Sequence, residues 1–118
     1  MAELRAGAKR SHWIWYVFPQ LKGLGHSPTA MYYGIGSLDE AKAYLAHPVL
    51  GPRLVQCTVV LGEIDGRTAE QILGSIDAQK LRSSMTLFLR AAPDEAVFRQ
   101  VLDKYFDGVA DDATDQRL

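Results

Sequence analysis

The residues of this chain that are best suited to chemistry gather near its start, between Lys9 and Gln20. This stretch holds two cations, a serine and a dense run of aromatic rings from His12 to Phe18. His12 could act as a general acid or base, or donate to an anionic ligand, because histidine changes its charge near neutral pH. It could also be a core histidine with one ring nitrogen bonded to a carbonyl. We expect Trp13, Trp15, Tyr16 and Phe18 to be core residues, because large rings supply most of the burial in a small core, although one face of this run could line a pocket.

A second polar stretch runs from Lys80 to Thr86 and carries three hydroxyl side chains around one helical turn. Serine and threonine are poor helix-interior residues because their hydroxyls compete for backbone hydrogen bonds. Two explanations are equally good: small side chains let a neighbouring helix approach, or the hydroxyls form the wall of a polar pocket. On the pocket interpretation, His12 is the catalytic residue and the ligand-binding residues are Arg10, Trp13, Gln20, Ser27, Tyr33, Lys80, Ser83 and Ser84.

These residue types suit a small anionic ligand, such as a nucleotide, an ADP-ribose-like molecule or a sugar phosphate. A tryptophan can stack on a ring, and lysine and arginine pair with phosphate. If the protein is an enzyme, we expect hydrolysis or group transfer with His12 as the acid–base group. The alternative is a non-catalytic protein-interaction module, in which Trp13 and Trp15 are core residues or interface anchors. No recognised catalytic motif decides between the two.

Composition limits the remaining classes of function. The formal net charge of −1 favours neither nucleic acid nor an anionic membrane. One cysteine, Cys57, permits no intrachain disulfide, and the three histidines are too widely spaced for a zinc site, so we expect neither metal nor cofactor. The longest apolar run is far shorter than the roughly 18 residues of a membrane helix, and no signal peptide is evident. We expect a single cytoplasmic domain over residues 1–118.

The pattern downstream of the aromatic segment is helical after a long glycine-rich loop over residues 20–36. Ser37 and Thr68 begin capping boxes, and Asp77 is a candidate cap for a third helix. The helix from Arg53 to Ile64 is apolar on most sides, which predicts that it is central and buried. The chain therefore reads as an all-α domain of about five or six helices, with residues 110–118 forming either a short helix or a frayed tail.

Motifs along nearly the whole chain resemble a bacterial family of domains of unknown function. They are Lys9-Arg10-Ser11-His12-Trp13, Phe18-Pro19-Gln20-Leu21, Gly23-Leu24-Gly25, Tyr33-Gly34-Ile35, Ala43-Tyr44-Leu45, Leu50-Gly51-Pro52-Arg53-Leu54, Ser83-Ser84-Met85-Thr86-Leu87-Phe88 and Lys104-Tyr105-Phe106. Members are often labelled calpastatin, and a mycobacterial member is mainly α-helical. The resemblance implies an all-α fold and supplies no catalytic residues. Calpastatin inhibitory segments are disordered and polar, whereas this chain is compact and aromatic, so we discount that label.

The resemblance also implies a difference at the start of the chain. Family members usually carry a further helix before the segment that matches Glu3-Leu4-Arg5. Without that helix, water would reach apolar faces of two segments, the helix from Arg53 to Ile64 and the aromatic run from Trp13 to Phe18. Each large side chain left in water forgoes about 1.5–3 kcal/mol. Because a self-complementary two-fold contact is the commonest remedy, we expect a homodimer or a higher oligomer.

Overall fold

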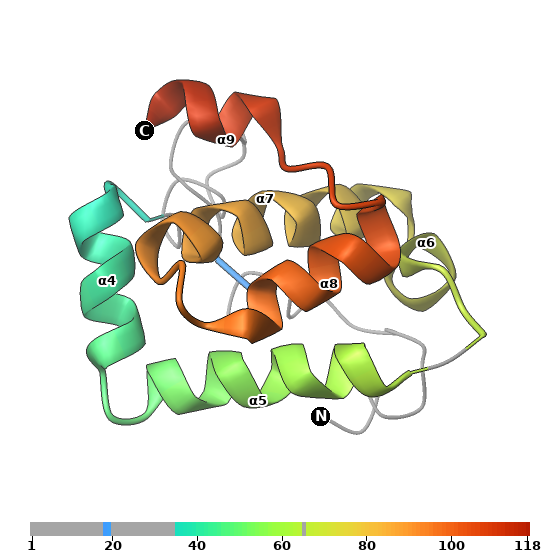
Figure 1. Ribbon diagram of the computed structural model, residues 1–118, viewed down its shortest axis with the longest axis horizontal. Helices are drawn as coiled ribbons and strands as arrows, with labels where there is room; N and C mark the ends of the chain where they lie inside the picture. Colours follow the sequence, from blue (N-terminus) through green and yellow to red (C-terminus); the bar gives the residue numbers. More distant parts are fainter. Residues whose placement is uncertain (1–17, 20–34, 65) are drawn as a thin grey trace.

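Helices make up most of the part of the chain that the computed structural model describes, residues 18–19, 35–64 and 66–118. Figure 1 labels them α4 to α9. They are α4 (Leu38–Ala46), α5 (Leu50–Glu63), α6 (Ala69–Leu73), α7 (Ser75–Ala91), α8 (Ala96–Phe106) and α9 (Asp112–Arg117). No strand occurs in these residues, and the predicted all-α fold is confirmed. The aromatic run and most of the glycine-rich loop lie outside the described residues.

Helix α7 lies at the centre of this arrangement and packs against α4, α6, α8 and α9. Helix α8 lies between α7 and α5, and α4 closes one end by packing on both α5 and α7 (Figure 1). Leu81, Met85 and Phe88 of α7 are fully buried, as their helical spacing predicts. The central helix of the domain is therefore α7, which also carries the second predicted polar stretch.

The two predicted capping signatures begin α4 and α6. The Ser37 hydroxyl accepts from the Glu40 backbone N–H, and Thr68 forms a complete capping box with Gln71. Glu40 departs from the reciprocal pattern, because its carboxylate accepts from the N–H of Gly36, at 2.9 Å, one residue before the cap. Both helix starts are thus fixed by local hydrogen bonds, which join residues three or four positions apart in the sequence.

The corner between α4 and α5 is unusually tight. The His47 Nδ1 atom accepts from the backbone N–H groups of both Val49 and Leu50, each at 3.1 Å. Gly51, in the first turn of α5, lies directly against the backbone of Leu45 near the end of α4. A histidine that serves as an acceptor and a glycine that permits close approach therefore define where α4 ends and how α5 begins.

Two sequence-based expectations for these helices are wrong. Helix α5 is not buried on most sides: Val59 is 38% exposed, because α4 and α8 pack on only part of the helix surface. Asp77 does not cap α7, which begins two residues earlier at Ser75. The positive φ of Gly74 lets α6 turn directly into α7, so Asp77 falls in the first turn, within 3.5 Å of Lys80.

The C-terminal segment forms a short helix rather than a frayed tail. Helix α8 ends at Phe106 and is followed by Asp107 and Gly108, both with positive φ; the Gly108 N–H donates to the Leu102 carbonyl at 3.0 Å. The chain then turns back, so that α9 lies against α7 (Figure 1). This reversal brings the acidic end of the chain onto the polar face of the central helix.

Candidate functional site

Three of the nine predicted site residues, Lys80, Ser83 and Ser84, lie on α7 within the described residues. The other six lie outside the described residues: Arg10, His12, Trp13, Gln20, Ser27 and Tyr33. The described part of the candidate site therefore consists of residues on α7. Its two adjacent serines are both buried, but only one of them has a hydrogen-bonded hydroxyl.

The hydroxyl of Ser83 is buried and has one partner on its own helix and one in the segment that leads into α9. Its Oγ atom lies 3.2 Å from the Gln79 carbonyl oxygen and 3.2 Å from the Asp111 carboxylate, either of which can accept its single proton. Asp111 belongs to the segment that leads into α9. Ser83 thus contributes to tertiary structure, and its role does not require a ligand.

The hydroxyl of Ser84 is fully buried and has no hydrogen-bond partner among the described residues. Other buried hydroxyls on these helices donate to the carbonyl four residues earlier, as Thr58 does to Leu54 and Thr86 does to Arg82. Ser84 makes no such bond. Leaving a buried hydroxyl unpaired costs about 1–3 kcal/mol, and native proteins contain few such groups. Ser84 is therefore the described residue that most needs an explanation beyond folding.

Lys80 lies four residues before Ser84, so the two side chains share one face of α7. The Lys80 ammonium is 3.5 Å from the carboxylate of Asp77, and the two side chains are 22% and 13% exposed. Along about two turns of helix, this face therefore carries a carboxylate, a partly buried ammonium and a fully buried, unpaired hydroxyl. An ammonium with three donors and a hydroxyl are suitable groups for binding a phosphate or a carboxylate.

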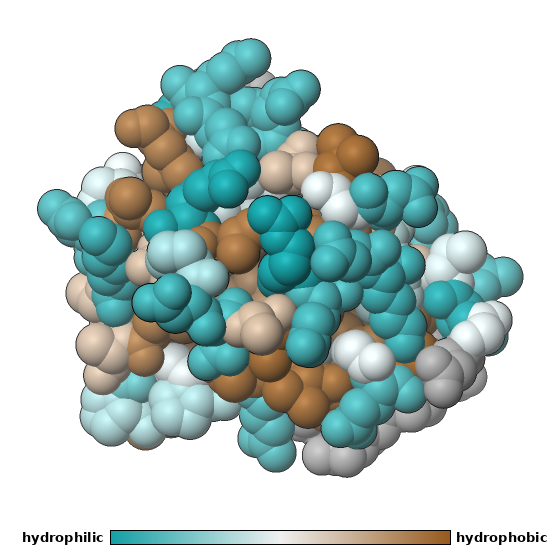
Figure 2. Space-filling view, in the orientation of Figure 1, coloured by the Kyte–Doolittle hydropathy of each residue, from teal (hydrophilic) through white to brown (hydrophobic). Residues whose placement is uncertain are grey.

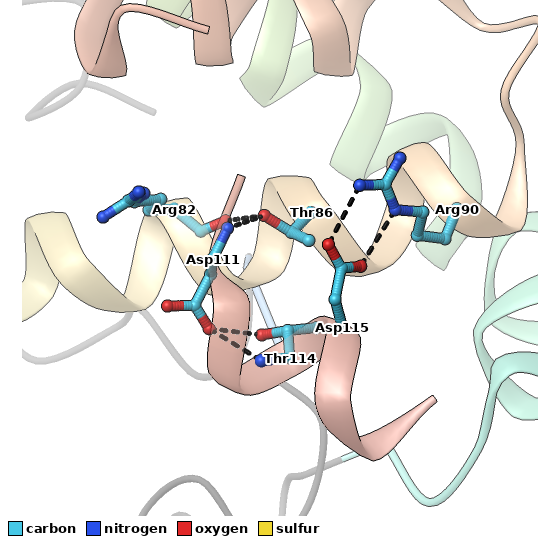
Figure 3. Close-up of polar contacts among 6 residues, drawn as sticks. All are labelled: Arg82, Thr86, Arg90, Asp111, Thr114 and Asp115. Atoms are coloured by element: carbon cyan, nitrogen blue, oxygen red, sulfur yellow. Dashed lines mark hydrogen bonds and ion pairs between the residues drawn. The ribbon is translucent and has the colours of Figure 1, made fainter. Parts of the chain in front are cut away.

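A second polar cluster on α7 was not predicted and holds the C-terminal segment in place (Figure 3). We call it the C-terminal clasp. It joins side chains of α7 to residues 109–115 and consists of Gln79, Arg82, Ser83, Thr86, Arg90, Val109, Ala110, Asp111, Thr114 and Asp115. Its members are separated by 25 to 32 residues in the sequence, so local patterns do not reveal them.

Asp111 is the centre of the clasp and is only 6% exposed. Its carboxylate caps α9 by accepting from the Thr114 N–H and hydroxyl, and it also accepts from the Gln79 amide at 2.9 Å. The Asp111 N–H donates to the Thr86 hydroxyl, also at 2.9 Å. Asp111 is therefore the N-cap residue of α9, and its spacing from Thr114 is the sequence signal for this role.

Two arginines complete the clasp. Arg82 donates to the carbonyls of Val109 and Ala110, and Arg90 forms two parallel hydrogen bonds, of 2.9 and 3.0 Å, with Asp115 (Figure 3). The hydrogen bond from Arg90 lowers the pKa of Asp115. The ion pair therefore stabilises the fold above the ordinary carboxyl pKa, and this contribution is lost as the pH falls through the lowered value. Both side chains are more than a third exposed, so the contribution is small.

A groove of about 340 Å³ lies between α5 and α8, on a different side of the domain from the clasp. The described residues that line it are Thr58, Val59, Gly62, Glu63, Val97, Gln100 and Lys104. Figure 2 shows apolar surface over α5 in this region, bordered by hydrophilic side chains. The Lys104 ammonium donates to the Gly62 carbonyl at 3.0 Å, and so joins the two walls at one end. Of the three predicted site residues that the structure describes, Lys80, Ser83 and Ser84, none lines this groove.

Among the described residues, no three His, Cys, Asp or Glu side chains are grouped so that they could hold a metal ion. Within those residues there is also no helix with the length and apolar character needed to cross a membrane.

Fold and site together define a small all-α domain with an unpaired buried serine on its central helix and an acidic C-terminal helix clasped beside it. The chain belongs to the family described as Protein of unknown function (DUF1810), whose model matches residues 1–118. It is also similar to the crystal structure of the conserved hypothetical protein Rv1873 from Mycobacterium tuberculosis, with 54% sequence identity and a TM-score of 0.97 over 99% of this chain and 84% of that one. No curated protein matches the chain. The family and its mycobacterial member, expected from the motifs, are confirmed.

Proposed function

We propose that this protein binds a small anionic ligand, a nucleotide or a sugar phosphate, at the face of α7 that carries Lys80 and Ser84. The supporting observation is the fully buried Ser84 hydroxyl, which has no partner among the described residues. A bound ligand would supply that partner and recover the free energy that the unpaired hydroxyl costs. The ammonium of Lys80, one turn earlier, would pair with the negative charge.

The rest of the proposed site comes from the first 35 residues. Trp13 and Tyr33 would stack on a base or sugar, and Arg10 would pair with phosphate. Gln20 and Ser27 would complete the polar contacts. In an enzyme of this kind, His12 would transfer the proton in a hydrolysis or group-transfer step. Ser83 is not assigned a ligand contact, because its hydroxyl lies within hydrogen-bond distance of the Asp111 carboxylate in the C-terminal clasp.

Direct binding measurements test this function. We would record the melting temperature of the full chain with ADP-ribose, ADP, ribose 5-phosphate and inorganic phosphate, and follow any shift by titration calorimetry. We expect at least one organic phosphate to raise the melting temperature, with an affinity that falls as salt is added. No shift from any of the four compounds at millimolar concentration would contradict the proposal.

The adjacent serines provide a matched pair of variants. Ser84→Ala removes an unpaired buried hydroxyl and introduces a better helix former, so we expect the ligand-free protein to gain about 1 kcal/mol of stability. The same variant should bind the ligand at least tenfold more weakly. Ser83→Ala should lose about 1 kcal/mol of stability through the clasp and keep its affinity. Urea unfolding and calorimetry measure both quantities. If Ser84→Ala loses stability and keeps its affinity, Ser84 is a structural residue.

The second candidate function, a non-catalytic interaction module, is supported by the groove between α5 and α8. Exposed Val59 and half-buried Val97 give this groove an apolar part, and α5 is one of the two segments on which we expected a homodimer contact. Sedimentation at micromolar concentration tests it. We expect a dimer that Val59→Lys converts to a monomer without loss of helix content. A wild-type monomer throughout this range would exclude that use of the groove.

A further inference from the structure

Helix α7 carries a row of hydrogen-bond donors that faces the C-terminal segment. Gln79, Ser83, Thr86 and Arg90 follow one another at intervals of three or four residues, and Arg82 is three residues after Gln79 and four before Thr86, so all five lie along one side of the helix. Gln79, Arg82, Ser83 and Arg90 donate to the C-terminal segment through an amide, a hydroxyl and two guanidinium groups, whereas the Thr86 hydroxyl accepts from the Asp111 N–H. A face with two arginines and several neutral donors is suited to an acidic peptide.

The segment that occupies this face is itself an acidic peptide. The carboxylates of Asp111 and Asp115, four residues apart, bond to side chains of α7, Asp111 to Ser83 and Asp115 to Arg90. Figure 3 shows the pair of Asp115 with Arg90 and the contact of the Asp111 carboxylate with Thr114. The segment buries little apolar surface: Val109 and Leu118 are 53% and 46% exposed, and Thr114 is the only residue of α9 that is fully buried. Its attachment therefore depends on polar contacts, in contrast to the apolar packing of α7 against α8.

We propose that the C-terminal segment, residues 109–118, is a displaceable internal ligand that covers a binding face for an acidic peptide of a partner protein. The partner sequence that this face fits has the pattern Asp-x-x-Thr-Asp, which the chain itself presents from Asp111 to Asp115. In the covered state the partner must compete with the attached copy, whose effective concentration is on the order of millimolar. Binding in trans therefore requires α9 to open.

Opening of α9 without global unfolding follows from its construction. A six-residue helix has no appreciable stability on its own and forms only while it is docked. Segments with few buried apolar contacts open locally at a lower free energy than the core does. The donors on α7 would then be exposed while the core around Phe88 and Phe98 stays packed.

Hydrogen exchange on the full-length protein tests the opening step. We expect the amides of residues 112–118 to exchange at least a hundredfold faster than those of α7 and α8, with rates that do not depend on denaturant at low urea. Asp115→Asn should increase their rate at least threefold and leave the α8 amides unchanged. Exchange of the α9 amides only through global unfolding would overturn the proposal.

Peptide binding tests the competition. The probe is a fluorescein-labelled synthetic peptide with the sequence of residues 109–118, and its control has Asn at the positions of Asp111 and Asp115. By anisotropy, we expect Asp115→Asn protein, whose internal ligand is weakened, to bind the probe at least fivefold more tightly than wild type.

A second variant separates a binding face from a merely structural contact. Arg82→Gln also weakens the clasp, but it damages the face itself, so it should bind the probe at least tenfold more weakly than Asp115→Asn. Equal binding by the two variants, or no saturable binding to Asp115→Asn at millimolar peptide, would overturn the proposal.

Discussion

Gly51→Ala is expected to lower the free energy of unfolding by about 3 kcal/mol or more, enough to leave much of the protein unfolded at 37 °C. A Cβ atom at this position would overlap the carbonyl oxygen of Leu45 and lie 2.8 Å from its carbonyl carbon. The obstacle is backbone, so no change of rotamer can relieve it. The corner cannot easily open either, because His47 accepts from two N–H groups there. Urea unfolding followed by far-ultraviolet circular dichroism measures the loss.

Gly62→Ala is the matched control for this prediction. Gly62 lies in the same helix, and nothing approaches within 4 Å of the Cβ atom that alanine would add. Since alanine is favoured over glycine inside a helix by about 1 kcal/mol, this variant should be slightly more stable than wild type. If Gly51→Ala lowers the free energy of unfolding and Gly62→Ala raises it, the close approach of the Leu45 backbone to Gly51 is the cause. If Gly51→Ala stays within about 0.5 kcal/mol of wild type, the corner relaxes and our account of it is wrong.

Phe88→Ala should cost about 3–5 kcal/mol, the range for removing a fully buried phenylalanine. The Phe88 ring on α7 lies 5.6 Å from the ring of Tyr44 on α4 and 5.8 Å from that of Phe98 on α8. Its loss would leave a cavity where three helices meet, together with the loss of two aromatic pairs. Chemical unfolding gives the stability change, and Phe88→Leu, which fills part of the cavity, should cost less than half as much.

The titration of Tyr44 supplies an independent readout of the same cavity. Burial raises the pKa of this phenol, while a hydrogen bond with Arg53 partly offsets the increase. If Phe88→Ala admits water beside the Tyr44 ring, its pKa should fall toward the ordinary value, as followed by ultraviolet absorbance. A cost below about 1 kcal/mol with an unchanged titration would show that the neighbouring side chains close the cavity.

The helices of this protein were predictable because their signals are local. Ser37 and Thr68 mark helix starts through bonds to residues three positions on, and the spacing of Leu81, Met85 and Phe88 marks the buried face of α7. The errors arose where tertiary context decides. The exposure of Val59 depends on how much of α5 its neighbours cover, which no feature of α5 itself reveals.

The candidate site also depends on tertiary contacts that the sequence does not reveal. Ser83 and Ser84 are adjacent, chemically identical and both buried, so sequence patterns treat them alike. They differ because Asp111, 28 residues away, reaches one hydroxyl and not the other. The polar stretch was recognised, but its division into a structural half and a candidate binding half depends on where the chain returns after Gly108.

The two bonds that His47 accepts at the corner between α4 and α5 also determine the tautomer of its ring. Nδ1 can accept from the N–H groups of Val49 and Leu50 only through its in-plane lone pair, so the neutral imidazole carries its proton on Nε2. In nitrogen magnetic resonance, His47 should therefore appear as a single Nε2–H tautomer, with Nδ1 as the accepting nitrogen.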